Sequence, residues 1–382
     1  SFLVQYKRKQ IYLITGVLIV IGFFGIIQLK TTGNITDDLA KDQALYKDLK
    51  FLEKNFGGVM PLEVLVDTKK KNGLLKSYNL RKINELSSLL STYPEFSKSS
   101  SYIDAVKYCK QAFYNGDSAY YSLPNSQEQR LILSYLKNSN EALGFVDLLM
   151  DSLRQEARIS LRIADISTSK MDSVFNNLLP EINKIFNPEK YDITITGATI
   201  VFLNGTKFLL KNLVMSLLLV IVLISIFMAW MFNSFRMVVV SIIPNLIPLF
   251  LTAAIMGYFG IALKPSTILV FSIAFGISVD DTIHFLAKYR QELIVNNWNM
   301  RRSVFSALNE TGVSMFYTSV VLFFGFFIFV ASDFGGTIAL GLLVSITLLI
   351  AMLANLLLLP ALLLSLERVI NYEAFQEPLL DT

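Results

Sequence analysis

The sequence has little cysteine, little histidine and few charged residues. Cys109 is the single cysteine, which excludes an intrachain disulfide and a cysteine metal cluster. Charged residues make up only 17% of the 382 residues and hydrophobic residues 53%, a composition too apolar for an ordinary soluble enzyme. The patterns of a phosphate-binding loop, a nucleophile with its base and a nucleic-acid surface are also missing. We therefore expect no enzymatic activity, no cofactor, no bound metal, no nucleic-acid partner and no ATP-driven step.

The hydrophobic residues are concentrated in six long runs. About 20 helical residues at 1.5 Å each cross a 30 Å hydrocarbon core, so each run can span a membrane. Inside lipid every backbone amide must be paired within its own segment, which favours helices. We predict an α-helical bundle of six transmembrane segments, at Ile11–Leu29, Leu213–Phe232, Met237–Phe259, Ile268–Ala287, Val313–Ala331 and Thr337–Leu364.

The basic residues near the helix ends predict the orientation. The first run is too long for a signal peptide and lacks a following cleavage site, so we interpret it as a retained helix. With both termini in the cytoplasm, the short loops on the opposite side contain only Lys264. This asymmetry favours cytoplasmic termini. The residues then assigned to the cytoplasmic side are Lys7, Arg8, Lys9, Arg236, Lys288, Arg290, Arg301, Arg302 and Arg368.

Four regions result from this topology. Residues 1–29 form the cytoplasmic N-terminus and first helix, 30–207 a large extracytoplasmic domain, 208–366 the other five helices, and 367–382 a cytoplasmic tail. Within 30–207, three segments alternate like strands and two have helical spacing, which predicts an α/β domain of βαβ type. The strands are expected at 62–67, 158–163 and 191–196, and the helices at 78–90 and 171–186. Residues 97–129 have weak periodicity and receive no assignment.

Three segments in or next to the membrane helices have features that predict their structure. Residues 198–211 run directly into the second span, which would connect the domain mechanically to the membrane. Pro244 and Pro248 each remove a backbone donor, so we expect the third helix to bend or to start late. Residues 288–311 have the pattern of an amphipathic cytoplasmic connector, lying at the interface or solvated as a loop helix.

The fourth span contains two adjacent carboxylates, Asp280 and Asp281. Burial and like-charge repulsion both disfavour the ionised form, so such a pair within a membrane could take up and release a proton. His284, the only histidine, lies on the same side of the helix as both. The alternative is that the pair lies at the cytoplasmic interface and is merely solvated, and that His284 only extends toward that interface.

Hydroxyl and amide side chains in the last two spans are candidate relay partners. Thr318 and Ser319 are the preferred candidates because they lie near the middle of the fifth span. Hydroxyls in membrane helices commonly bond their own backbone, so a structural role is the alternative for each. The other candidates are Thr311, Ser314, Ser345, Thr347 and Asn355.

The segment Gly276–His284 resembles the resistance–nodulation–division (RND) superfamily, especially its hydrophobe/amphiphile-exporter and MMPL-like branch. The resemblance covers the whole chain, and one helix, a large outer domain and five helices form that family's half-repeat. The matching motifs are Gly276-x-x-x-Asp280-Asp281, Tyr289-Arg-x-Glu292, Ala307-Leu-x-x-Thr311-Gly312, Leu359-Pro360 and Phe56-Gly57-Gly58.

The resemblance implies a proton-driven exporter of a hydrophobic or amphiphilic, lipid-like substrate in the bacterial inner membrane. It implies Asp280 and Asp281 as the proton relay and the outer region as a porter-like periplasmic domain. Family members usually have two halves, so we expect a second half in the same polypeptide, in another copy or in a partner. This half is most like the carboxyl-terminal one. Membrane lipids and accessory envelope proteins are further expected partners.

Three other functions are alternatives to export. A SecD/SecF-like protein-export component shares the half-repeat plan, but its resemblance is weaker. A non-transporting scaffold or sterol-sensing-like binding module would not need the charges of Asp280 and Asp281. Intramembrane proteolysis needs carboxylates that converge from separate helices, which neighbours in one helix cannot do.

Overall fold

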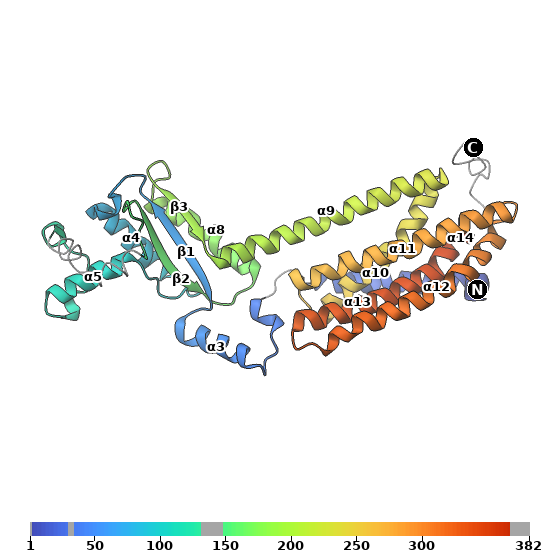
Figure 1. Cartoon of the computed structure of the whole chain (residues 1–382), viewed down its shortest axis with the longest axis horizontal. Helices are drawn as coiled ribbons and strands as arrows, with labels where there is room; N and C mark the ends of the chain where they lie inside the picture. Colours follow the sequence, from blue (N-terminus) through green and yellow to red (C-terminus); the bar gives the residue numbers. More distant parts are fainter. Residues whose placement is uncertain (1, 30–33, 131–147, 367–382) are drawn as a thin grey trace. The chain divides into compact units, whose positions relative to one another are not determined.

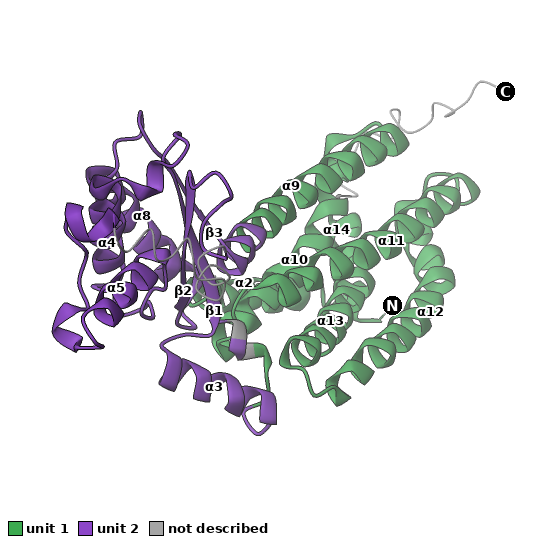
Figure 2. Ribbon diagram, turned by 60° about the vertical axis from the view of Figure 1, so that its left-hand side comes forward, with its two compact units in different colours: residues 1–33, 37–40, 206–382 green, residues 34–36, 41–205 purple. Residues whose placement is uncertain are grey.

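The structure is a computed structural model that describes residues 2–29, 34–130 and 148–366 (Figure 1). The predicted tail at 367–382 lies outside the described residues. The chain divides into two compact units (Figure 2). We call residues 1–33, 37–40 and 206–382 the helical unit, and residues 34–36 and 41–205 the sheet unit.

The helical unit contains the predicted membrane helices. Among the described residues, six helices are long and apolar enough to cross a membrane, as predicted. A short helix α1 (Phe2–Tyr6) precedes the first of them, and η4 (Ile328–Ala331) follows the fifth. The six are α2 (Arg8–Ile27), α9 (Ala198–Phe232), α10 (Phe235–Phe259), α11 (Pro265–Val295), α12 (Met300–Phe327), and α13 (Gly335–Leu353), which continues through the π-helical turn η5 (Ala354–Leu358) into α14 (Leu359–Leu366).

Residues 288–311, predicted as a connector, are divided between the ends of two long helices. Helix α11 continues to Val295 and α12 begins at Met300, so only four residues separate them. Asn297 and Trp298 adopt positive φ angles of 50° and 63°, which reverse the chain abruptly. The Asn299 side chain then caps α12 by accepting a hydrogen bond from the amide of Arg302 at 3.0 Å.

Two other helices also begin earlier than their hydrophobic runs. Helix α9 is continuous from Ala198, as the sequence predicted, and the boundary between the units falls within it. Helix α10 begins at Phe235 and passes through both Pro244 and Pro248. The late start proposed for this helix is therefore excluded.

The sheet unit contains a three-stranded sheet in the order β2-β1-β3 (Figure 1). The three predicted strands are confirmed as β1 (Met60–Asp67), β2 (Glu156–Ile163) and β3 (Asp192–Thr196). Both neighbours pair antiparallel with β1, which lies between them. A βαβ unit of adjacent parallel strands is therefore not formed; the helix between β2 and β3 instead belongs to a split arrangement.

The core of the sheet unit lies between the sheet and its helices. Residues of β1 alternate between buried and more exposed, and its buried side chains join those of the helices in one apolar cluster. The helices in this cluster are α4 (Ser77–Leu90), α5 (Tyr102–Phe113) and α8 (Thr168–Ile185). Helix α3 (Ala44–Phe56) has no buried residue. The short 3₁₀ turns are η1 (Ile35–Asp38), η2 (Gly73–Leu75) and η3 (Ser118–Tyr120). Helix α5 lies in the segment that received no assignment. Its start is fixed by a capping box between Ser101 and Asp104.

Candidate functional site in the helical unit

Four fully buried polar side chains form a layer across α10, α11 and η5. They are Asn245, Ser278, Thr282 and Asn355, each no more than 1% exposed. The Oδ1 atom of Asn245 accepts hydrogen bonds from the hydroxyls of Ser278 at 2.7 Å and Thr282 at 3.0 Å. The amide nitrogen of Asn355 donates to the carbonyl of Ser278 at 3.1 Å. We call this set the polar layer.

The Thr282 hydroxyl has three acceptors within reach but only one hydrogen to donate. They are Oδ1 of Asn245 at 3.0 Å, Oδ1 of Asn355 at 2.9 Å and the carbonyl of Ser278 at 3.1 Å. A small rotation of this hydroxyl therefore changes which helix it bonds. The polar layer can accordingly exchange hydrogen bonds between helices without moving their backbones.

A wide turn in the last span carries Asn355. Residues Ala354–Leu358 form a π-helical turn between α13 and α14. Pro360 follows and has no amide hydrogen for the carbonyl of Leu356, so the ordinary α-helical ladder is interrupted there. Such wide turns are frequent at functional sites.

The carboxylate pair lies on another face of α11. Asp280 is exposed, with 72% of its side chain accessible, whereas Asp281 is half-buried. The next residue, Thr282, is fully buried in the polar layer. As the i, i+4 spacing predicted, His284 lies beside Asp280, with 3.5 Å between Nε2 and Oδ1.

Asp280 belongs to a row of small and polar residues on the exposed face of α11. The row is spaced at intervals of four residues, and all its members are exposed. A Cβ atom added to Gly276 would meet nothing within 4 Å. The members are Ser272, Gly276, Asp280 and His284, and we call them the α11 row.

Thr318 and Thr347, two other sequence candidates, make their hydrogen bonds to groups other than the Asp pair. The exposed Thr318 hydroxyl reaches the carbonyls of Ser314 and Met315 on its own helix, both at 3.1 Å. Ser319 is buried on α12. Thr347 shares a 2.5 Å hydrogen bond with Thr252 of α10.

Sequence reasoning named Asn355 but missed Asn245, Ser278 and Thr282. The signal was present in part, because Ser278 and Thr282 are four residues apart and therefore share one helix face. Asn245 was read only as the neighbour of two helix-bending prolines. Which of these positions faced the interior could not be decided without the packing of α10 and η5.

Charged contacts fix both ends of α11. At its C-terminal end, Lys288 binds Glu292 at 3.2 Å and also Glu310 of α12. Before its N-terminus, Lys264 pairs with Asp38, which also accepts a 3.2 Å hydrogen bond from Ser266. Within residues 2–29, 34–130 and 148–366, no three His, Cys, Asp or Glu side chains gather to hold a metal ion.

Comparison with known proteins assigns the chain to a family. The model of the MMPL family matches residues 145–373, a range that contains α8 to α14, the polar layer and the Asp pair. The comparison with curated proteins gave no match. Because the family match covers more than half of the sequence, the chain belongs to the MMPL family.

Proposed function

We propose that the protein exports a hydrophobic or amphiphilic, lipid-like substrate and that proton movement through Asp280 and Asp281 drives this export. The family assignment and the apolar helices support a transporter of the RND/MMPL kind rather than an enzyme. The observation that supports the proton step is that a carboxylate and a residue of the polar layer are neighbours on α11. Asp281 stands directly before Thr282, whose hydroxyl belongs to the exchangeable polar layer.

The depth of the pair supports a position inside the membrane. Within the predicted span Ile268–Ala287, Asp280 lies about 18 Å from one end and about 10 Å from the other at 1.5 Å per residue. A hydrocarbon core is about 30 Å thick, so this span would hold Asp280 inside it, nearer the cytoplasmic side. An ionised carboxylate facing lipid there costs about 3 kcal/mol or more. Protonation, or a covering partner, removes that cost.

In the proposed cycle the proton changes the packing of three helices. A proton on Asp281 removes a charge at the edge of the polar layer, and the Thr282 hydroxyl then exchanges its acceptor between Asn245 and Asn355. This biases the packing of α10, α11 and η5. Helix α9 would transmit the change toward the sheet unit, since it runs continuously from Ala198. His284 would hold the proton on the exposed side.

We propose that a second half, like the two halves usual in this family, packs against the α11 row. Small and polar residues favour close helix packing, whereas lipid favours apolar side chains. Ser272, Gly276 and Asp280 together leave an exposed face suited to another helix. That helix would belong to the same polypeptide, to a second copy or to a partner chain. Accessory envelope proteins remain further proposed partners.

The proposed location is the bacterial inner membrane, with cytoplasmic termini and a periplasmic sheet unit. Arg8 donates to the carbonyl of Leu364 at 3.2 Å, so the start of α2 and the end of α14 lie together. Basic residues at this end then face the cytoplasm, as the positive-inside rule expects.

The experiment is proton flux in proteoliposomes of phosphatidylethanolamine and phosphatidylglycerol that contain the full chain and a trapped pH-sensitive dye. After a proton gradient is imposed, we expect Asp280→Asn and Asp281→Asn each to lower the protein-dependent flux at least about tenfold. A tenfold loss corresponds to an activation free energy that is higher by about 1.4 kcal/mol. Asp48→Asn removes an exposed carboxylate from α3 in the sheet unit and should leave the flux unchanged.

Undiminished flux in both span variants would exclude the relay and favour a non-transporting binding module. Equal losses in all three variants would show an effect of net charge rather than of the α11 pair. A loss in only Asp281→Asn would locate the relay at the residue next to the polar layer.

A further inference from the structure

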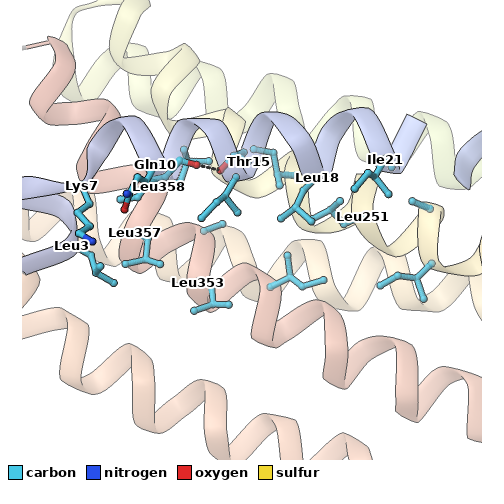
Figure 3. Close-up of a pocket in the computed structure, with 18 of the residues that line it drawn as sticks. Leu3, Lys7, Gln10, Thr15, Leu18, Ile21, Leu251, Leu353, Leu357 and Leu358 are labelled. Atoms are coloured by element: carbon cyan, nitrogen blue, oxygen red, sulfur yellow. Dashed lines mark hydrogen bonds between the residues drawn. The ribbon is translucent and has the colours of Figure 1, made fainter. Parts of the chain in front are cut away.

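An apolar groove runs along α2 in the helical unit. Its volume is about 460 Å³, and its walls come from α2, α10 and the segment α13–η5 (Figure 3). Leu18 lines it from α2, Leu251 from α10 and Leu353 from α13. It lies away from the α11 row and has no residue in common with the polar layer.

Contacts join α2 to the neighbouring helices on two sides of the groove. On one side, Tyr12 donates to the carbonyl of Ala361 at 2.7 Å, which ties α2 to α14. On the other side, Gly257 of α10 packs directly on the backbone of Gly25. There the Tyr258 hydroxyl also donates to the carbonyl of Ile21 at 2.6 Å. These contacts hold α2 against α10 and α14 beside the groove.

The one charged side chain that lines the groove is at one end. Lys7 and Gln10 line that end and are both exposed, whereas the opposite end contains Ile21 (Figure 3). The Thr15 hydroxyl within the groove already donates to the carbonyl of Ile11 at 2.9 Å. An occupant that matches this lining has an anionic polar group at one end and a long apolar body.

The length of the groove fits one acyl chain. From Gln10 to Gly22 the α2 backbone rises about 18 Å at 1.5 Å per residue. This is close to half of a 30 Å hydrocarbon core, the depth that a chain anchored at the surface reaches. Arg8 lies next to Lys7 in the sequence, and positive charge near the membrane surface attracts anionic lipid headgroups.

We infer that this groove binds one acyl chain of an anionic phospholipid whose phosphate group contacts Lys7. The bound chain would contact Ala354, Leu357 and Leu358. These residues belong to the wide turn that also carries Asn355, so the lipid would support the packing of that turn. The inference does not depend on proton-driven export, because the groove contains neither Asp280 nor Asp281.

The test is photolabelling of the full chain in phosphatidylcholine vesicles that contain a trace of phosphatidylglycerol with a diazirine at the end of one acyl chain. Mass spectrometry should place the label on groove residues such as Leu18 and Leu251. Lys7→Gln should lower this labelling several-fold. Lys9→Gln removes the same charge two residues away, outside the groove, and should leave the labelling unchanged.

A second pair of variants tests the groove itself. Ile14→Trp places an indole in the groove and should displace the lipid label, whereas Leu13→Trp, on an exposed neighbour outside the groove, should not. The inference is overturned by uniform labelling of all apolar helix surfaces, by equal labelling with the phosphatidylcholine analogue, or by equal losses in both lysine variants. Protein–protein cross-links through α2 in place of lipid label would equally overturn it.

Discussion

The two units differ in where many of their apolar side chains lie. In the sheet unit, apolar residues such as Val64 and Ile159 are fully buried. In the helical unit, Leu218 and Val222 of α9 are more than half exposed, while Asn245 and Thr282 are completely buried. Lipid around the membrane helices explains the exposed apolar side chains, because lipid removes the advantage of hiding them. Cohesion in the helical unit must therefore depend more on close packing and internal hydrogen bonds.

The largest effect is expected from a charge in the core of the sheet unit. Val64→Asp places an unpaired carboxylate in a fully buried position, so we expect a loss of more than about 4 kcal/mol of folding free energy. Limited proteolysis of the full chain should then cut the sheet unit rapidly. Leu65→Asp, on the other and only half-buried face of β1, should have a clearly smaller effect. Equal cleavage of the two variants would contradict the assigned strand face.

A smaller effect is expected from the polar layer of the helical unit. Asn245→Leu leaves the hydroxyls of Ser278 and Thr282 without their shared acceptor, which should cost about 1–3 kcal/mol. The measurement is the thermal unfolding midpoint of the full chain in detergent. Ser272→Ala on the exposed row is the matched control and should change the midpoint little. A stabilised Asn245→Leu protein would show that apolar packing outweighs hydrogen bonding in this unit as well.

This contrast also explains what the sequence could predict. All three strands and six apolar helices followed from hydrophobic periodicity and run length, because both report burial or lipid contact directly. The antiparallel pairing of β2 with β1 did not follow, since it connects residues about 100 positions apart. In the membrane helices nearly every residue is apolar, so periodicity does not reveal the inner face. The role of Asn245 therefore emerged only from its contacts with α11.

The end of α11 shows a second limit of sequence reasoning. Charged residues beyond Ala287 ended the predicted span, but the helix continues for two further turns to Val295. Lys288 is accommodated there because Glu292 and Glu310 pair with it. A charge marks the end of a hydrophobic run rather than the end of a helix. This is why the predicted connector was replaced by two long helices.

The smallest effect is expected from a surface ion pair of the sheet unit, where water weakens the interaction. The Lys170 ammonium lies 2.9 Å from Glu95, and its hydrogen bond holds the pKa of the Glu95 carboxyl below its ordinary value. A lowered pKa in the folded state means that this stabilisation is complete above the unfolded pKa of about 4.3 and disappears as the pH falls through the folded value. Lys170→Met should therefore destabilise the unit by less than about 1 kcal/mol at pH 7.

The same variant should be no less stable than the unchanged protein once the pH lies below both pKa values of Glu95. The measurement is thermal unfolding of the full chain, followed by circular dichroism, at pH 7 and at a pH below both pKa values of Glu95. It compares the stability of the variant with that of the unchanged protein at each pH. Lys184→Met, in the last turn of the same helix, removes an equal charge without touching Glu95 and should show no such pH dependence. If both variants lose stability equally at pH 7, net charge rather than the pair controls the effect. The ion-pair contribution of the sheet unit would then be negligible beside the buried hydrogen bonds of the helical unit.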